Sequence, residues 1–282
     1  AIATGHDHTI ALSSDGTLWS WGWNTYGQLG DETTDRRYTP TQIGADNWSD
    51  VAAGDWHTVG LKSDGTLWSW GDNTAGQLGD GTIATSPPTR RHTPTQELTG
   101  TVNWLSIAAS ITHTTGLKSD GTLWAWGSNA YGQLGDGTRI DRYTPTQEST
   151  LSTNWSVIAA GKLHTVALKS DGTLWAWGSN FHGQLGDGTT IGRIIPTQES
   201  TGATNWSSIS AGSYHTIALK SDGTLWAWGY NYYGQHGDGP DENRKQTPTQ
   251  IGVDTWSKIA AGYEHTVGLK SDGTLWTWGY NS

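Results

Sequence analysis

The sequence predicts an all-β protein that forms a single β-propeller, and three observations support this fold class. A phrase of the pattern HTxxLxSDGTLWxWGxN occurs six times, beginning at His8, His57, His113, His164, His215 and His265. The composition favours turns and aromatic packing, with 39 Gly, 19 Trp and only 15% charged residues. Each repeat also contains signals for about four short strands, which is the content of one propeller blade.

The repeat spacing defines the expected blades. The residue three before each His marks the repeat, and the successive spacings are 49, 56, 51, 51 and 50, the longest reflecting a longer loop at 80–92. We expect one domain over residues 1–282, with repeats at approximately 1–47, 48–103, 104–154, 155–205, 206–255 and 256–282. The last repeat stops at WGYNS, so we expect six blades, the last without its outer strand.

The fourth repeat shows how each strand is predicted in turn. The apolar stretch WSVIAA, which leads to Gly161, indicates the first strand. HTVAL and TLWAW indicate the second and third strands, because the Ser-Asp-Gly between them favours a tight hairpin turn. The Pro-Thr-Gln segment at the end of the repeat indicates a weak outer strand, since Pro is tolerated at a sheet edge.

The distribution of Trp predicts how neighbouring blades pack. Trp175 and Trp177 are two residues apart and share one face of their strand, whereas Leu174 and Ala176 share the other. The same Trp pair occurs in all six repeats, so a bulky face can pack on the small face of the next blade. Five more Trp open the first strand of repeats two to six: Trp48, Trp104, Trp155, Trp206 and Trp256. Each buried Trp contributes roughly 2 to 3 kcal/mol, which supports stability without disulfides.

Charge and composition exclude several classes of function. The net charge of -10 and the pI near 5.3 disfavour nucleic acid and anionic membranes, which require clustered cations. No run of residues has the length of a membrane helix, and the N-terminus lacks the features of a signal peptide. The absence of Cys is compatible with the cytoplasm and with a secreted bacterial protein, so the compartment stays open. The absence of Met indicates a chain that was processed, trimmed or cut from a longer one.

No motif in the sequence supports catalysis, a cofactor or a metal. The six repeated His could suggest a metal ring, but ligands must converge within about 2.1 Å of one ion. Equivalent positions on six blades do not converge, so we expect these His to be structural residues that hydrogen-bond a turn or an adjoining blade. The Asp of SDGT and GDGT fit turns rather than a calcium loop. Asn-Trp-Ser at 47, 154 and 205 matches the glycosylation acceptor motif. All three matches lie in the same repeated phrase, so they count as a single coincidence.

The positions at which the repeats differ from one another predict a binding face. Because the second and third strands are antiparallel, GxxHT and WGxNxxG lie at the same end of each blade. The variable residues at this end contain eight of the ten Tyr, and aromatic residues at variable surface positions are typical of recognition surfaces. The alternative is that these positions vary through sequence drift and that their aromatic residues serve local packing. The candidate binding face consists of Trp23, Tyr26, Asp55, Trp56, Tyr131, Phe181, His182, Tyr214, Tyr230, Tyr232, Tyr233, Tyr263 and Glu264.

A second variable zone follows GQLGD and contains all eight Arg. We expect them at the rim, where they are solvated loop charges or, alternatively, pair with an acidic partner or a second copy of this chain. An oligomer formed through these loops, or through the incomplete last blade, is compatible with the sequence. The eight residues are Arg36, Arg37, Arg90, Arg91, Arg139, Arg142, Arg193 and Arg244.

The phrases WGxNxxGQLGDGT and GxxHT recur in order over the whole chain, and in them the chain resembles the regulator of chromosome condensation repeat family. The resemblance implies a propeller, usually of seven blades, so a fragment of a seven-bladed propeller is the alternative to six. It also implies similarity in fold to the plant ultraviolet-B photoreceptor and to bacterial propellers that inhibit β-lactamases.

Our functional expectation is a non-catalytic binding or scaffold propeller that presents the variable aromatic face to a protein partner, or alternatively to a glycan. The resemblance implies three other functions: guanine-nucleotide exchange on a small GTPase, an ultraviolet-sensing dimer and β-lactamase inhibition. The Gly-Trp-Arg-His-Thr phrase of the photoreceptor is absent, and Gly-Asp-Trp-His-Thr at 54–58 is the nearest match. Near-identical repeats also leave open an engineered or recently amplified propeller without a native ligand.

Overall fold

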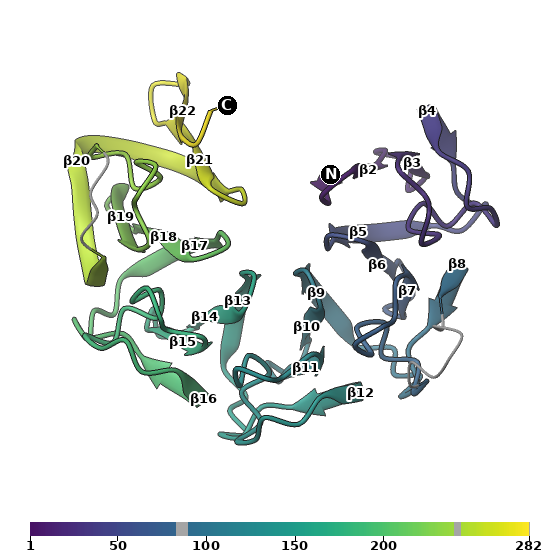
Figure 1. The fold of residues 1–282 in the computed structure, drawn as a ribbon, viewed down its shortest axis with the longest axis horizontal. Coiled ribbons are helices and arrows are strands. Elements are labelled where there is room, and N and C mark those ends of the chain that lie inside the picture. The colour runs from purple at the N-terminus through teal and green to yellow at the C-terminus, as the bar shows by residue number, and fades with distance from the viewer. Residues whose placement is uncertain (83–89, 240–243, 282) are drawn as a thin grey trace. The chain divides into compact units, whose positions relative to one another are not determined.

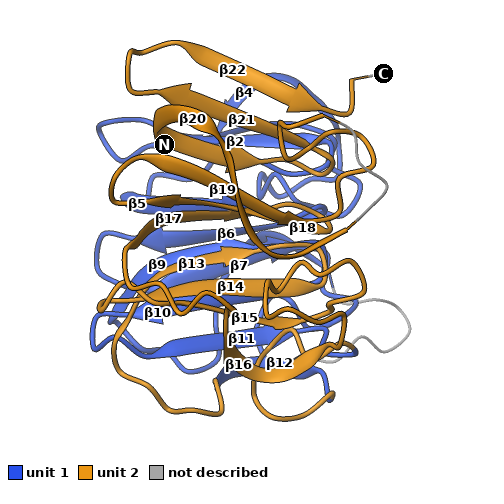
Figure 2. Ribbon diagram, turned by 90° about the vertical axis from the view of Figure 1, so that its left-hand side faces the viewer, with its two compact units in different colours: residues 1–130, 140–147 blue, residues 131–139, 148–282 orange. Residues whose placement is uncertain are grey.

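The computed structural model describes residues 1–82, 90–239 and 244–281, and these residues form strands and turns without any helix. The strands pair in chain order as antiparallel sheets, which confirms the all-β propeller prediction (Figure 1). Residues 83–89, within the long loop expected at 80–92, lie outside the described residues. The chain divides into two compact units, which Figure 2 colours separately.

The first unit, residues 1–130 and 140–147, contains three four-stranded sheets. The first sheet consists of β1 (Ile2–Thr4), β2 (His8–Leu12), β3 (Leu18–Gly22) and β4 (Arg37–Gln42). The second consists of β5 (Trp48–Ala53), β6 (His57–Lys62), β7 (Leu67–Gly71) and β8 (Arg91–Gln96). The third consists of β9 (Trp104–Ala109), β10 (His113–Lys118), β11 (Leu123–Gly127) and β12 (Arg142–Gln147).

The second unit, residues 131–139 and 148–282, contains a four-stranded sheet and a six-stranded sheet. The four-stranded sheet consists of β13 (Trp155–Ala160), β14 (His164–Lys169), β15 (Leu174–Gly178) and β16 (Arg193–Gln198). The six-stranded sheet consists of β17 (Trp206–Ala211), β18 (His215–Lys220), β19 (Thr224–Gly229), β20 (Lys245–Ala261), β21 (His265–Lys270) and β22 (Leu275–Gly279).

The prediction of six blades is wrong, because the described strands form five sheets. β20 is 17 residues long; it pairs with β19 between Lys245 and Thr255 and with β21 between Trp256 and Ala261. The strands of the sixth sequence repeat therefore join the fifth sheet. The cause lies in the connecting segment, where Ile251, Val253 and Thr255 alternate as β-branched residues and favour a continuous strand. The corresponding segment before β5 has Ala45 and Asn47 at the last two of these positions, and there the strand is interrupted.

Each hairpin between the second and third strands of a repeat has the same register. In the fourth sheet His164 lies opposite Gly178, and Leu168 lies opposite Leu174. The turn between them places Gly172 at a φ of 79°, a left-handed conformation that favours glycine. The Asp171 side chain accepts hydrogen bonds from the backbone N–H and the hydroxyl of Thr173, and these bonds fix the turn.

The hydrophobic core of each unit lies between consecutive repeats. Between the first and second sheets, Ile10 and Leu18 pack with Trp48 and Trp70, and all four side chains are buried. The ring centroids of Trp48 and Trp70 are 5.6 Å apart in an edge-to-face arrangement. The same combination recurs in the second unit, where Val166 and Leu174 pack with Trp206 and Trp228. Each repeat therefore completes its core only when its neighbour is present.

One backbone carbonyl per interface joins consecutive repeats by hydrogen bonds. The Gln28 carbonyl, in the GQLG loop after β3, accepts from the Thr58 hydroxyl at 2.8 Å and from the Trp70 indole N–H at 3.0 Å. The same two bonds reach the carbonyls of Gln77, Gln133, Gln184 and Gln235 from the Thr and Trp of the following repeat. We call this arrangement the Gln latch.

The Gln latch predicts a measurable stability difference between two equivalent threonines. Thr58→Val removes the hydroxyl without changing the side-chain shape and leaves buried polar groups unpaired, so the free energy of unfolding should fall by about 1 to 3 kcal/mol. Thr9→Val is the matched control, because Thr9 has the same position in the first repeat and its hydroxyl makes no hydrogen bond to the described residues; we expect a change below about 0.5 kcal/mol. Urea unfolding measures both values, and equal losses would contradict the latch.

Candidate binding face

The candidate residues lie in loops at one end of the sheets. In every repeat the His that begins the second strand pairs with the Gly that ends the third, as His57 does with Gly71. The loop before the second strand and the loop after the third are therefore adjacent. All thirteen candidate residues lie in these two kinds of loop.

In the first unit the structure brings Tyr26 and Trp56 together. Their rings stack with centroids 5.3 Å apart and an interplanar angle of 22°. Tyr26 follows β3 and Trp56 precedes β6, so the pair joins the first repeat to the second. Trp23 is exposed and lies under the guanidinium of Arg36, at 5.7 Å from its ring centroid. Asp55, the residue before Trp56, is half-buried.

In the second unit six aromatic residues form one continuous cluster, which we call the Tyr cluster. The His182 ring lies 5.0 Å from Tyr214 and 4.9 Å from Tyr230. Tyr230 in turn contacts both Tyr232 and Tyr233. Tyr233 then contacts the ring of Tyr280, with centroids 4.7 Å apart. The Tyr cluster thus consists of His182, Tyr214, Tyr230, Tyr232, Tyr233 and Tyr280.

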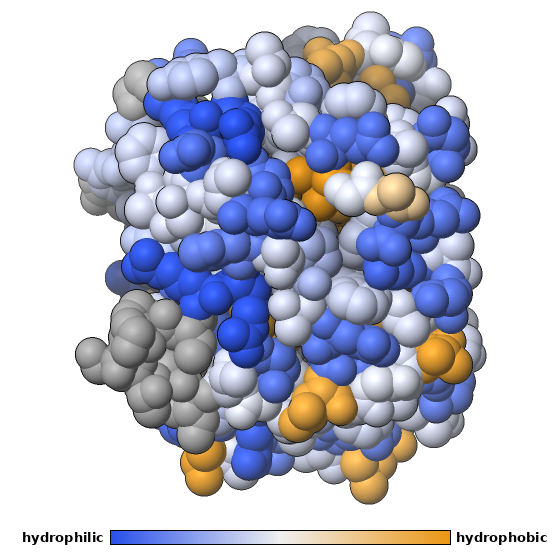
Figure 3. Space-filling model, turned by 90° about the vertical axis from the view of Figure 1, so that its right-hand side faces the viewer, coloured by the Kyte–Doolittle hydropathy of each residue, from blue (hydrophilic) through white to orange (hydrophobic). Residues whose placement is uncertain are grey.

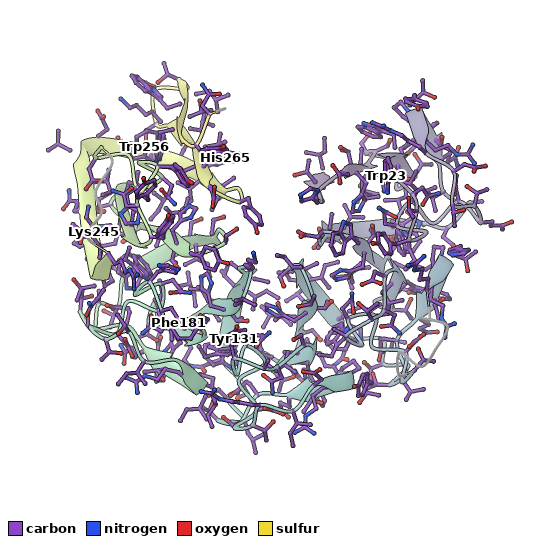
Figure 4. The ribbon with its side chains drawn as sticks, viewed as in Figure 1. Trp23, Tyr131, Phe181, Lys245, Trp256 and His265 are labelled. Atoms are coloured by element: carbon purple, nitrogen blue, oxygen red, sulfur yellow. The ribbon has the colours of Figure 1, made fainter. Side chains whose placement is uncertain are left out.

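Several aromatic side chains of the second unit are partly exposed to solvent. Tyr232 is 51% exposed and Tyr280 is 49% exposed. Tyr131 and Phe181 form a separate edge-to-face pair with centroids 6.0 Å apart, and Figure 4 shows the two side chains next to each other. Phe181 is 60% exposed, so an aromatic ring of this pair is also open to solvent.

The few charged groups near the Tyr cluster interact directly with its aromatic residues or with Tyr263. Burial disfavours the charged form of Lys162, but its hydrogen bonds to the Tyr263 and Tyr214 hydroxyls outweigh this effect and raise its pKa. Burial and the neighbouring Arg244 lower the pKa of His182, so this side chain is neutral at pH 7. Burial, Tyr233 and the Glu264 carboxylate raise the pKa of Tyr230. The Tyr cluster is therefore an uncharged aromatic surface with two cations, Lys162 and Arg244, and one anion, Glu264, at its edge.

The sequence did not reveal that rim arginines reach this face. The Arg90 guanidinium lies 4.5 Å from the centroid of the Tyr26 ring, and Arg244 donates a hydrogen bond to the Phe181 carbonyl. Both Arg come from loops that we expected at the rim, separate from the aromatic residues. The signal that could have identified them is their position just before the outer strand, since Arg90 reaches the loop after β3 and Arg244 reaches the loop after β15.

Three other rim arginines form ion pairs within their own repeats. Arg37, Arg91 and Arg193 each bind the Asp of the preceding GD pair, namely Asp31, Asp80 and Asp187. The same Asp31 also accepts from the Asn24 side chain, which in turn accepts from the Leu29 backbone N–H. These three cations therefore fix the conformation of their GQLGD loops.

The repeated His side chains are engaged by neighbouring repeats. His8 Nε2 lies 3.0 Å from the Thr58 hydroxyl, which donates its single proton to the Gln28 carbonyl. His8 must therefore donate from Nε2, which assigns the neutral Nε2–H tautomer. His57, His164 and His215 make the same bond to Thr114, Thr216 and Thr266. His113 is also buried, whereas His265 is exposed (Figure 4).

The described residues contain no group of three or more His, Cys, Asp or Glu side chains that could hold a metal ion. Within the same part of the chain there is no helix of the length and apolar character that a membrane crossing requires.

The fold and the face together define a class of protein: a repeat propeller whose interfaces are built from identical latches and whose variable loops carry aromatic residues. Models of the regulator of chromosome condensation (RCC1) repeat match most of the chain. One model matches residues 15–61, 64–117, 120–168, 171–219 and 222–269, and a second matches five shorter segments between residues 1 and 235. The chain belongs to the RCC1 repeat family, and the five matched repeats agree with the five sheets.

Curated relatives and solved structures agree with this assignment. The chain is 34% identical over 245 residues to the ultraviolet-B receptor UVR8 of Arabidopsis thaliana, covering 85% of this chain and 55% of the receptor. It is 38% identical over 239 residues to the human probable E3 ubiquitin-protein ligase HERC4, covering 84% of this chain and 22% of HERC4. The structure of Prp20p from Saccharomyces cerevisiae superimposes with a TM-score of 0.83 at 26% identity, covering 99% of this chain and 71% of that one. The chain thus spans about half the length of the first curated relatives, and less of HERC4.

The buried His predict that the protein loses stability in mild acid. Burial lowers the pKa of His57, His164 and His215 to about 3 and that of His8 to about 4, from 6.5. Below pH 6.5 the unfolded chain binds protons at these His while the folded chain does not. The free energy of unfolding should therefore fall as the pH is lowered from 6.5 toward these values, by up to about 1.4 kcal/mol per pH unit for each His.

Urea unfolding at pH 7, 6 and 5 measures this dependence. The turn carboxylates do not interfere, because hydrogen bonds from Thr17 and Thr66 keep the pKa values of Asp15 and Asp64 below 3.8. His57→Gln should reduce the slope with pH, whereas His6→Gln should not reduce it, because the hydrogen bond to Asp7 raises the pKa of His6. A free energy of unfolding that is constant from pH 7 to 5 would contradict the neutral buried state.

Proposed function

We propose that this protein is a non-catalytic binding propeller that presents the Tyr cluster to a protein partner. The observation that carries the proposal is the cluster itself: six aromatic rings from four loops contact one another and leave Tyr232 and Tyr280 about half exposed. Aromatic side chains held rigidly by their neighbours are typical centres of protein interfaces, because little conformational entropy is lost on binding. Phe181 and Tyr263 extend the apolar surface on the same unit.

Relatives support a protein rather than another kind of partner. One solved structure is described as Kap60 bound to yeast RCC1 (Prp20), and another reports the binding properties of Prp20p to Gsp1p and histones. These statements concern those proteins, and the propeller is the part that this chain shares with them. HERC4 is named a probable ligase, but this chain spans 22% of it, so the propeller accounts for a small part of that protein.

The proposal includes the absence of catalysis. The structural hydrogen bonds of the repeated polar side chains support this part of it. The His that recurs in each repeat would be the obvious general base. In the latches described above it is buried, neutral and hydrogen-bonded to Thr. The turn carboxylates likewise accept hydrogen bonds from their own turns. These residues are therefore engaged in folding rather than free for proton transfer.

The proposal predicts that Tyr232→Ala weakens binding of the partner by at least about tenfold, because truncation of an interface anchor removes contact area at its centre. Tyr230→Ala and Tyr233→Ala should act in the same direction. A partner isolated by affinity capture is purified, and its dissociation constant is measured by calorimetry for each variant. If the partner is a small GTPase, a nucleotide-release assay with the same variants separates binding from exchange.

The matched control is Tyr38→Ala. Tyr38 is 82% exposed on β4 of the first unit and lies outside the candidate face. This change should leave the dissociation constant unaltered. Equal affinity of the native protein and all three Tyr-cluster variants would overturn the assignment of this face.

A further inference from the structure

The two ends of the Tyr cluster differ in the charged groups beside them. At one end Lys162 Nζ lies 5.2 Å from the ring centroid of Tyr214, and Arg244 donates to the carbonyl of Phe181, the residue before His182. The other end consists of three tyrosines from two loops, and we call it the three-Tyr site: Tyr232, Tyr233 and Tyr280.

The central ring of the three-Tyr site is Tyr233. Its centroid lies 5.0 Å from that of Tyr232, with the ring planes at 89°, and 4.7 Å from that of Tyr280, with the planes at 59°. Tyr233 is half-buried, whereas the two rings beside it are each about half exposed. Because both exposed rings contact the same third ring, one bound group can touch both of them.

Elsewhere on the protein, aromatic rings of the loops and edges are covered by a cation of the same chain. Rings with a Lys or Arg group within 6 Å of the centroid include Trp23 and Tyr38 with Arg36, Tyr26 with Arg90, and Tyr214 and Tyr263 with Lys162. No Lys or Arg of the described residues lies over a ring of the three-Tyr site. On the side of the molecule with β4 and β8, moreover, exposed hydrophobic residues are isolated from one another (Figure 3). The three-Tyr site thus combines grouped rings with the lack of a cation.

The charged group that does lie at this site is a carboxylate. Glu264 is half-buried in the loop before β21, and its backbone carbonyl accepts from the Tyr280 N–H at 2.9 Å. Burial, followed by the Glu264 carboxylate, raises the pKa of Tyr233, and no cation is among the groups that act on this phenol. The carboxylate forms no ion pair or hydrogen bond with the part of the chain that the structure describes. A negative charge beside aromatic rings, whose faces are also negative, leaves a place that a cation would complement.

We propose that the three-Tyr site and Glu264 bind one cationic side chain, a lysine or an arginine, of the protein partner. This inference rests on the proposed function and names the chemistry of its contact. The ring faces attract a cation through their quadrupole, and the carboxylate adds a direct charge interaction. The net charge of -10 of the chain also attracts a basic partner over a longer range.

The two cations of the Tyr cluster are engaged at its other end. Lys162 donates to the Tyr263 hydroxyl, and Glu264 is not among the groups that act on its pKa. Arg244 is bound to the Phe181 carbonyl. An anionic ligand at the three-Tyr site would therefore face the unpaired Glu264, and an apolar side chain would bury this carboxylate without a partner. A cationic side chain avoids both costs.

The test uses the full chain and four probes: the Nα-acetyl methylamides of lysine and arginine, and those of norleucine and citrulline as their neutral counterparts. The tyrosine rings are labelled with carbon-13, and their NMR shifts are followed at pH 7 as each probe is added. We expect the cationic probes to shift the resonances of the three-Tyr site saturably. Their dissociation constants should be at least about threefold lower than those of the neutral counterparts.

Variants assign this preference to the rings and to the carboxylate. Tyr280→Leu should abolish the preference, whereas Tyr280→Phe keeps the ring and should retain it. Glu264→Gln should reduce the preference at least about twofold. The matched control is Glu32→Gln, which removes the same charge from an exposed position of the first unit and should leave the preference unchanged. The inference is overturned if cationic and neutral probes bind equally, if Tyr280→Leu keeps the preference, or if Glu264→Gln behaves like Glu32→Gln.

The partner assay of the proposed function separates the two proposals. Glu264→Gln should weaken the partner and lower the dependence of its affinity on salt concentration. If Tyr232→Ala weakens the partner but Glu264→Gln does not, the binding face stands and the cation site is wrong. If the probes bind as expected but none of the Tyr-cluster variants affects the partner, the cation site stands and the proposed function is wrong.

Discussion

The structure depends on a single acceptor in each interface, the backbone carbonyl of the Gln in the GQLG loop. Two donors from the next repeat converge on it, a Thr hydroxyl and a Trp indole N–H. In the complete latches a His from the preceding repeat donates to the same Thr, so four groups share one network. Because these groups are buried, none can be removed without leaving an unpaired partner. This constraint explains why the phrases that contain them recur in all copies.

The same constraint decides where the repeats can differ. The second and third strands of each repeat consist of core residues and latch residues. Substitutions there would therefore disturb the packing against the neighbouring sheet. The variable positions in the loops beyond His and Gly take no part in the latch. Trp56, Tyr214 and Glu264 occupy the same position in three of these loops, and the latch His that follows each of them is identical. Variation is therefore confined to a surface that the identical framework positions.

The sequence was sufficient for local structure and insufficient for long-range contacts. The hairpins, the strand order and the Trp packing follow from residues close together in the chain, such as Ser-Asp-Gly between two apolar strands. The number of sheets was mispredicted because it depends on whether Ile251, Val253 and Thr255 bend or continue, which a repeat count does not reveal. The contacts of Arg90 and Arg244 with the aromatic loops join residues 63 or more positions apart. The buried Glu97, Glu148 and Glu199 were likewise missed, because a charged residue in a connection is ordinarily solvated.

An array of near-identical repeats also supplies its own measure of what is unusual. A hydrogen bond that forms in some copies and is missing in others shows which local residues decide it. The indole N–H groups of Trp48 and Trp256 are such a case: both are buried without a hydrogen bond among the described residues, because Ile43 and Ile251 stand where the other connections have a buried Glu. In the Tyr cluster, His182 Nδ1 is buried without a hydrogen bond in the described part of the chain. Local departures that lower stability tend to persist where they serve a function.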